Sequence, residues 1–181
     1  MRTRGVSAPL YPFSHSGPVL VCGSAWCLFE DLEKARKIFP EANIIAVNGA
    51  SRDIQASMLV SQHAVNFKNA RWVHFQQKFK HTFSIHSTAP DSLVQYVWNL
   101  KHRGGSAWLA RRIAYSIGFD QVVLCGCPMV QGNYVNHRPG MLMSKLQVVD
   151  DLFLQIEQDK DWHEGCYSMS GRTREILGEP R

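Results

Sequence analysis

The chain has 181 residues, 45% of them hydrophobic and 19% charged, with 20 Lys and Arg against 15 Asp and Glu for a formal net charge of +5. This length fits one domain, and the composition is that of a globular protein and excludes a disordered tail. No apolar stretch approaches the roughly 20 residues that a membrane-spanning helix needs, and the small positive excess permits an anionic partner without requiring one.

The first elements predict a strand, a helix and a second strand after an irregular leader at 1–17, with one domain over 18–181. The apolar run Val19–Cys22 predicts a buried strand. A helical repeat follows and stops at Pro40, which cannot continue a helix. Its inward positions are Leu28, Leu32, Ala35 and Phe39, and the opposite side carries most of the charged residues Glu30, Asp31, Glu33, Lys34 and Arg36. Asn43–Val47 predicts the second strand, parallel to the first.

The middle of the chain has weaker patterns. Ser51–Gln62 predicts a helix with Ile54, Met58 and Leu59 inward. Short strands are expected at Ala64–Phe67, Trp72–Phe75 and Phe83–His86. Thr88–Asp91 has the spacing of a capping box, which predicts a helix ending in the basic turn Lys101–Arg103. Its apolar face would be Leu93, Val94, Val97, Trp98 and Leu100.

The last third has the clearest signals. Ser106 follows two glycines as a candidate N-cap, and Gly118 stands where a helix ends in a left-handed residue. Val122–Gly126 is apolar enough for a central strand. Lys145–Gln158 predicts a long amphipathic helix, and Arg172–Leu177 a short one. The inward positions would be Ala107, Ala110, Ile113, Ala114 and Ile117 in the first helix, and Leu146, Val149, Phe153 and Ile156 in the second.

Strands and helices therefore alternate, which predicts an α/β fold of three layers around a mostly parallel sheet. In such folds, ligands bind at the carboxyl ends of the strands, where the strand order switches. That rule selects the loops Gly23–Cys27, Asn48–Arg52 and Gly126–Pro139, together with the helix start at Gly105-Ser106.

Two glycine-containing helix starts are candidate phosphate sites. Gly23-Ser24 follows a strand and opens a helix, so backbone amides and the helix dipole could hold an anion there; the alternative is a tight turn. Gly104-Gly105-Ser106 is a similar candidate, and its alternative is a plain helix start. The full dinucleotide fingerprint and the P-loop lysine are absent, and Asn48 replaces the acid that binds a nicotinamide ribose. These differences disfavour a nicotinamide site.

Four of the five cysteines lie at two strand ends, as Cys22, Cys27, Cys125 and Cys127. Zinc sites usually have two-residue gaps between paired cysteines, which these lack, so we expect buried thiols and no metal. Strand alternation predicts that Cys125 and Cys127 point to one face. The thin spread of cysteines and the lack of a secretory signal predict a cytoplasmic protein with reduced thiols.

Polar residues after the late strand are candidates for catalysis. Among eight histidines, His137 stands out in a polar loop with Tyr134 and Arg138. Histidine titrates near neutral pH and can act as a general base, and Arg138 could bind phosphate; the alternative is a solvated loop. Arg172 and Arg174 open the last helix, where they would clamp a phosphate or form a solvated basic tail.

Several short motifs together resemble a Rossmann-like superfamily. They are Val-Leu-Val-Cys-Gly-Ser at 19–24, Ala-Val-Asn at 46–48, Val-Val-Leu-Cys-Gly at 122–126 and the Gly-Gly-Ser-Ala segment at 104–119. That superfamily groups hydroxymethylpterin pyrophosphokinase-like proteins with bacterial sialyltransferases. The segment Ser-Met-Ser-Gly-x-Thr-Arg-Glu at 168–175 is similar to uncharacterised proteins of phages and prophages.

The resemblance implies that Gly23, Ser24, Asn48 and Ser106 hold a cytidine nucleotide donor, and that Tyr134 and His137 handle phosphate and acceptor. Two departures are visible. Gly126-Cys-Pro128 stands where relatives often have Gly-Ile-Asp or Gly-Val-Asp, which weakens a magnesium-dependent pyrophosphokinase activity. Ala25-Trp26 stands where relatives tend to have Gly-Pro.

The leading hypothesis is a transferase-like protein that takes a nucleotide or nucleotide-sugar as substrate, with no other cofactor and no metal. Its site would comprise His137 as the catalytic base and Gly23, Ser24, Asn48, Gly105, Ser106, Tyr134 and Arg138 as nucleotide ligands. The alternative is a phage-encoded module that binds a nucleotide or a host protein without turnover. Nucleic-acid binding is disfavoured because no basic helix or aromatic RNA-binding motif is present. The sequence leaves open whether the protein is a homo-oligomer.

Overall fold

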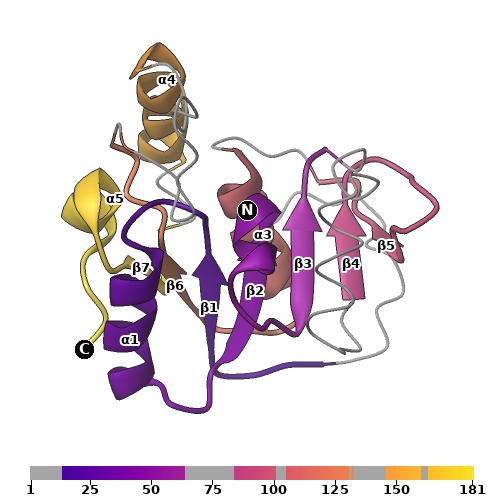
Figure 1. Cartoon of the computed structure of the whole chain (residues 1–181), viewed down its shortest axis with the longest axis horizontal. Coiled ribbons are helices and arrows are strands. Elements are labelled where there is room, and N and C mark those ends of the chain that lie inside the picture. The colour runs from indigo at the N-terminus through magenta and orange to yellow at the C-terminus, as the bar shows by residue number, and fades with distance from the viewer. Residues whose placement is uncertain (1–13, 64–83, 101–104, 131, 133–145, 160–162) are drawn as a thin grey trace.

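A seven-stranded parallel sheet in the order β5-β4-β3-β2-β1-β6-β7 organises the protein (Figure 1). The computed structural model describes residues 14–63, 84–100, 105–130, 132, 146–159 and 163–181. The strands are β1 (Pro18–Cys22), β2 (Asn43–Val47), β3 (Met58–Ser61), β4 (Ser84–Ser87), β5 (Tyr96–Val97), β6 (Gln121–Cys125) and β7 (Cys166–Ser168). The helices are α1 (Leu28–Ile38), α3 (Gly105–Ser116), α4 (Leu146–Gln158) and α5 (Gly171–Leu177), and η1 (Asn48–Arg52) is a 3-10 turn.

The two faces of the sheet have separate cores. Val19 and Val21 of β1 pack in a cluster with residues of α3, whereas Leu20 and Cys22 pack in a second cluster with residues of α1. This alternation is the two-residue period of a strand buried on both faces. The predicted α/β fold of three layers with a parallel sheet is confirmed, with α1 and α3 on opposite faces (Figure 1).

Most predicted elements outside the middle of the chain are confirmed. The strands at 19–22, 43–47 and 122–126 correspond to β1, β2 and β6, and the predicted helices correspond to α1, α3, α4 and α5. The strand predicted at 83–86 corresponds to β4. The polar segment before α5 adds a strand, β7, that was not predicted. No helix in the part of the chain that the structure describes is long and apolar enough to cross a membrane.

The helix predicted at Ser51–Gln62 is wrong. The turn η1 ends at Arg52, and β3 begins at Met58. All four residues of β3 are buried, because the strand has neighbours on both edges and core on both faces. A strand buried in this way has a continuous apolar run, which periodicity alone does not separate from a buried helix.

The helix predicted after Thr88–Asp91 is also wrong, because this segment forms the edge strand β5. Its ladder to β4 is extended by bonds from Gln95 N to Ile85 O at 3.0 Å and from Trp98 N to Ser87 O at 2.8 Å. Tyr, Val and Trp in succession favour an extended backbone more than a helix. The strands predicted at 64–67 and 72–75 and the basic turn at 101–103 lie outside the described residues.

Residues 14–17 of the expected leader contact the turn between α3 and β6. His15 N donates to Ile117 O at 3.0 Å, and the His15 ring stacks on Phe119 with centroids 4.6 Å apart. Gly118 has a φ of +108°, and a Cβ there would lie 2.4 Å from His15 O. Glycine is therefore needed at this helix end both for its conformation and for the close approach.

A buried histidine joins the two outer strands. His86 is fully buried, its Nδ1 accepts from Trp98 Nε1 at 2.9 Å, and its Nε2 lies 2.7 Å from Ser84 Oγ. Indole nitrogen is only a donor, so the neutral imidazole carries its hydrogen on Nε2 and donates it to Ser84. Burial, and next the charge of His15, lowers the pKa of His86 to about 4.

His86 predicts a loss of stability in mild acid. Its pKa is about 4 when folded and ordinarily 6.5, so the unfolded chain binds more protons between these values. The free energy of unfolding should therefore fall as pH drops from 6.5 to 4, by at most about 3 kcal/mol from this residue. Urea unfolding at several pH values should show that the free energy of unfolding depends less on pH in His86→Gln than in the wild type. The same pH dependence in both proteins would contradict this assignment.

Candidate functional site

The carboxyl ends of β1 and β6 meet through two glycines. Gly23 N donates to Cys125 O at 2.8 Å, and Ala25 N donates to Gly126 O at 3.2 Å. A Cβ on Gly23 would lie 2.5 Å from Gly126 O, and a Cβ on Gly126 would lie 2.5 Å from Gly23 O. The two loops can approach this closely only because both residues lack a side chain.

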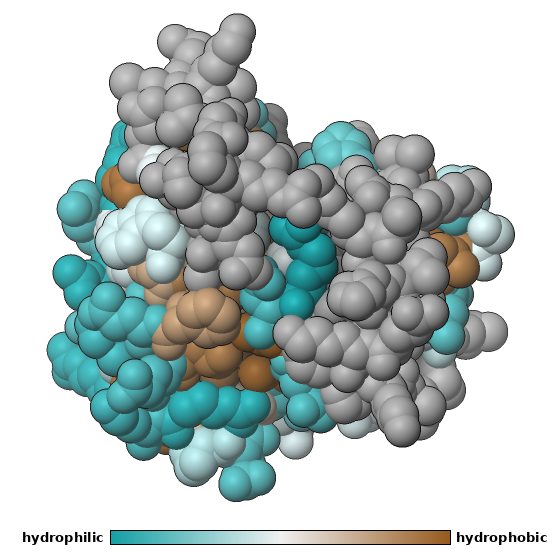
Figure 2. All heavy atoms as spheres, in the orientation of Figure 1, coloured by the Kyte–Doolittle hydropathy of each residue, from teal (hydrophilic) through white to brown (hydrophobic). Residues whose placement is uncertain are grey.

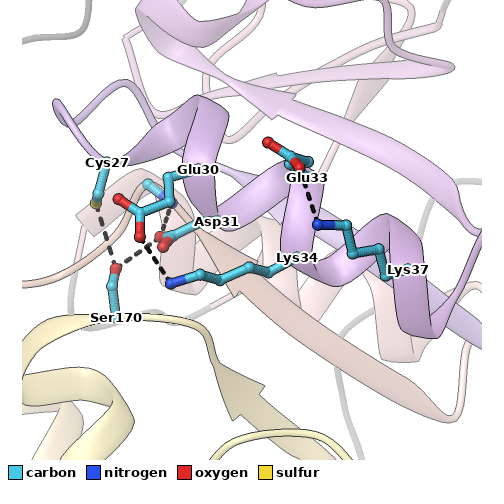
Figure 3. A network of polar contacts seen from close by, with 8 residues as sticks. Cys27, Glu30, Asp31, Glu33, Lys34, Lys37 and Ser170 are labelled. Carbon is cyan, nitrogen blue, oxygen red and sulfur yellow. Dashed lines mark hydrogen bonds and ion pairs between the residues drawn. The ribbon is translucent and has the colours of Figure 1, made fainter.

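Asp31, an acid of α1, bonds to this junction and to Ser170; Figure 3 shows Asp31, Ser170 and Cys27. Asp31 is 2% exposed, and its Oδ2 accepts from Gly126 N at 2.8 Å and from Ser170 Oγ at 2.6 Å. Ser170 Oγ also lies 3.2 Å from Cys27 Sγ. Since the serine hydrogen goes to Asp31, the thiol donates to the serine. One chain of hydrogen bonds thus connects α1, the loop after β6 and the segment between β7 and α5.

The placement of Asp31 corrects the sequence prediction, which put it on the solvated side of α1. Asp31 lies three residues after Leu28 and four before Ala35, so all three share one helix face and are buried. The helical spacing therefore contained this information. Carboxylates are rarely buried without partners, and Asp31 has two hydrogen-bond donors.

The segment 168–175 fastens the loop after β6. Thr173 Oγ1 donates to Cys127 O at 2.8 Å, and Arg172 N donates to Pro128 O at 2.9 Å. A Cβ on Gly171, whose φ is +64°, would lie 2.3 Å from Pro128 O. The glycine and threonine of this motif are thus accounted for by packing and hydrogen bonding against residues 127–128.

The two arginines of α5 have different surroundings. The Arg172 guanidinium pairs with Asp150 of α4 and lies over the Phe153 ring, 3.8 Å from its centroid. Arg174 is exposed. Arg172 therefore joins α5 to α4, which neither of its two sequence interpretations anticipated.

All five cysteines are buried free thiols, as predicted for the four at the strand ends. Cys22 and Cys125 are register partners in the core beside α1, whereas Cys127 lies in the core beside α3. The prediction that Cys125 and Cys127 share a face is therefore wrong, because Gly126 turns left-handed with a φ of +62° between them. Among the described residues, no group of His, Cys, Asp and Glu could hold a metal ion.

Four of these thiols are also poor nucleophiles. Burial raises the pKa of Cys27 to about 12 and that of Cys166 to about 12. Burial likewise raises the pKa of Cys127, and the contact with Cys22 raises that of Cys125. They remain protonated at neutral pH, and only thiolates attack or bind metal efficiently.

A polar cluster lies at the carboxyl edge on the β2 side of β1. Gly49 lies under two side chains: a Cβ there would be 2.9 Å from Arg52 Nη2 and 3.4 Å from Ser24 Oγ. Arg52 Nε donates to Gly49 O at 3.3 Å, which orients the guanidinium. Asn48 has a φ of +49°, and its buried Oδ1 has no hydrogen-bond partner among the described residues. Ser24, Asn48, Gly49 and Arg52 are called the edge cluster below.

Asn48 shows that the edge cluster is not internally satisfied. A left-handed conformation costs an asparagine little but is still uncommon, and a buried acceptor without a donor costs about 1–3 kcal/mol. Such defects concentrate at functional sites, where a ligand can provide the missing donor. Sequence analysis selected the loop 48–52 but did not single out Arg52, although a cation after a strand end was a visible signal.

The predicted residues of α3 lie at the next strand along the same edge. Ser106 is 9% exposed, and its Oγ accepts from Gln62 N at 3.3 Å, directly after β3. Gly105 is the first helical residue, with a φ of +80°. Ser106 thus lies inside the helix with its hydroxyl turned to β3, and is not the predicted N-cap. Gly23, Ser24, Asn48, Gly105 and Ser106 therefore lie at the ends of β1, β2 and β3 and the start of α3, whereas Tyr134, His137 and Arg138 lie outside the described residues.

A separate groove of about 1030 Å³ lies elsewhere, between α1 and the amino ends of β2 and β3. Figure 2 shows apolar surface between hydrophilic side chains on the face that carries α1. The apolar residues that line the groove include Phe29, Leu32, Ile44, Ile54 and Ala56. The groove borders residues that precede β2 and β3, so it is distinct from the carboxyl edge.

Comparison with known proteins supports the fold. No protein-family model matches the chain, and no curated protein matches it in sequence. Among solved structures it is similar to the MAf glycosyltransferase from Magnetospirillum magneticum AMB-1, with a TM-score of 0.57 and 14% identity. The match covers 92% of this chain and 34% of that one. At this identity the likeness shows a shared fold, and this chain spans about one third of the neighbour's length.

Asp31→Asn tests the hydrogen-bond chain. The amide keeps the shape but not the charge, so its oxygen in the place of Oδ2 would accept from Gly126 N and Ser170 Oγ only through neutral and weaker hydrogen bonds. We expect the free energy of unfolding in urea to fall by about 2–3 kcal/mol. Glu30→Gln is the matched control, because Glu30 is an exposed acid on the same helix paired with Lys34. Equal urea midpoints for the two variants would contradict this role of Asp31.

Proposed function

We propose that the protein is a glycosyltransferase-like protein that binds a nucleotide or nucleotide-sugar at the carboxyl edge of β1, β2 and β3. The observation that carries this proposal is the edge cluster, where Arg52 and Ser24 converge over Gly49 beside the unpartnered Asn48 Oδ1. The fold shared with a glycosyltransferase and the resemblance to sialyltransferase motifs support it.

The chemistry of the edge cluster suits a nucleotide phosphate and sugar. A guanidinium forms charge-assisted hydrogen bonds with phosphate oxygens, and the Ser24 hydroxyl adds a neutral donor. Asn48 Oδ1 would accept from a ribose hydroxyl or a base amino group. Ser106, on the neighbouring element, would contribute a further hydroxyl contact.

In the proposed transfer, an acceptor hydroxyl oxygen bonds to the anomeric carbon of the donor sugar, and the bond from that carbon to the phosphate oxygen breaks. The nucleotide leaves with that bonding pair on its phosphate, which Arg52 would stabilise. The hydroxyl proton passes to a base, for which we propose His137, with Tyr134 and Arg138 nearby in sequence. These three residues lie outside the described part of the chain.

Arg52→Ala tests the donor site. One guanidinium–phosphate contact is worth about 1.5–3 kcal/mol, so removing it should weaken nucleotide binding by roughly tenfold to 150-fold. CMP, UMP and AMP would be compared by thermal shift, and the best of them by calorimetry. Arg174→Ala removes the same charge from an exposed site on α5 and should bind like the wild type.

Failure to bind any of the three nucleotides would overturn the proposal. Equal affinity of the wild type and Arg52→Ala would remove Arg52 from the site. Asn48→Ala gives an independent check, because it removes the unpartnered acceptor and should weaken the same nucleotide.

His137→Ala separates binding from turnover. If His137 is the base, the variant should keep its nucleotide affinity and lose release of CMP from a CMP-activated sugar, with or without an acceptor, by at least about 100-fold. Chromatography of the released CMP measures this rate. Release at the wild-type rate would exclude His137 as the base.

Binding without turnover is the second candidate function, and one observation favours it. Pro128 stands where the resembling families often have an acid, and its carbonyl and ring pack against Arg172 N and Gly171. This loop therefore has a structural partner where those families have a carboxylate. This function predicts that a nucleotide raises the melting temperature of the wild-type protein and that the wild type releases no CMP from a CMP-activated sugar.

A further inference from the structure

Trp26 is an exposed aromatic on a firmly held backbone. Its side chain is 52% exposed, whereas its neighbours Ala25 and Cys27 are 1% and 2% exposed. Ala25 N is bonded to Gly126 O, and Cys27 Sγ contacts Ser170 Oγ. The indole is therefore presented to solvent from a backbone fixed on both sides, which limits the entropy lost when a ligand packs on it.

Ser24 and Trp26, two residues apart in the first loop, lie beside different loops. Ser24 lies beside Gly49, which follows β2. Trp26 lies beside Gly132, which follows β6; a Cβ on Gly132 would be 2.6 Å from both Cδ1 and Nε1 of the indole. β1 is also where the strand order switches, because β2 follows on one side and β6 lies on the other. Trp26 thus lies over the switch point, where ligands bind in open parallel sheets.

The donor side of this switch point is already polar. Ser24, Asn48 and Arg52 suit phosphate, ribose and base edges, whereas the β6 side presents an aromatic surface. A pyranose has hydroxyls at its rim and a C–H face that is apolar, and such a face packs on an indole. In a direct in-line displacement at the anomeric carbon, the acceptor approaches from the side opposite the leaving nucleotide.

We propose that the sugar ring of the acceptor packs on the indole of Trp26. The indole occupies the space that a side chain at Gly132 would need, so the glycine permits this position of the indole. This inference rests on the proposed function, because it assigns the second substrate of the same site. Proline, which the resembling families tend to have at this position, offers a smaller and non-aromatic surface. Trp26 therefore sets a preference for a pyranose acceptor that is particular to this chain.

The test uses sugar binding, so it does not depend on turnover. Saturation-transfer NMR would be recorded on the full chain with methyl β-galactoside, methyl β-glucoside and lactose, each with and without CMP. We expect at least one sugar to receive saturation mainly at protons of one ring face. Trp26→Ala should weaken the binding of this sugar at least tenfold, and Trp26→Phe should keep part of the affinity that Trp26→Ala loses.

Two further variants control for unrelated effects. Gly132→Ala keeps the tryptophan but forces the indole to move, so it should weaken sugar binding as Trp26→Ala does. Phe29→Ala removes another half-exposed aromatic, at 51%, that lines the separate groove, and should leave sugar binding unchanged.

The outcomes separate this inference from the proposed function. No saturation of any sugar, with or without CMP, overturns the inference, as does equal sugar binding by the wild type and Trp26→Ala. CMP binding in the same samples reports on the donor site alone and should be equal in all Trp26 variants. CMP binding without sugar binding leaves the proposed function standing and rejects the acceptor platform.

Discussion

The close approach of Gly23 and Gly126 is the constraint on which the site depends, because it sets the spacing of the loops after β1 and β6. Each backbone fills the space that a Cβ of the other would need. Asp31 then accepts from Gly126 N and, through Ser170, draws in the segment after β7. A buried carboxylate with two donors is costly to disturb, since removing it leaves both donors unsatisfied. The scaffold of the edge is therefore a hydrogen-bonded unit of α1, β6 and α5.

Two side chains of the loop after β1 have different neighbours. Ser24 lies beside Gly49 and Arg52 after β2, and Trp26 lies beside Gly132 after β6. The surroundings of Ser24 include a cation and an unpartnered amide oxygen, whereas Trp26 provides an aromatic surface. The arrangement suits a reaction between a phosphate-bearing donor and an apolar ring face of an acceptor. Asp31, Ser170 and Thr173, which fix the loops after β1 and β6, are distinct from the residues that would contact a ligand.

Sequence patterns predicted the parallel sheet, because β1, β2 and β6 are short apolar runs at helix-separated spacing. They failed where burial hides periodicity: Met58–Ser61 has core on both faces, and Tyr96–Val97 is decided by pairing with β4. Asp31 stands on the buried stripe of its helix by spacing alone, but its partners Gly126 and Ser170 lie far away in sequence. The Arg52 side chain is oriented by the local turn at Gly49, and a single glycine with positive φ moved Cys127 to the other face. Residues 133–145, which carry three of the predicted site residues, lie outside the described structure.

Hydrogen–deuterium exchange of the full chain with and without saturating CMP tests the central claim most directly, because it locates the nucleotide. The claim predicts slower amide exchange in the peptides that cover Gly23–Cys27 and Asn48–Arg52 and little change around the groove between α1 and β3. Protection confined to residues 54–57 and the outer face of α1, or no protection anywhere, would contradict it.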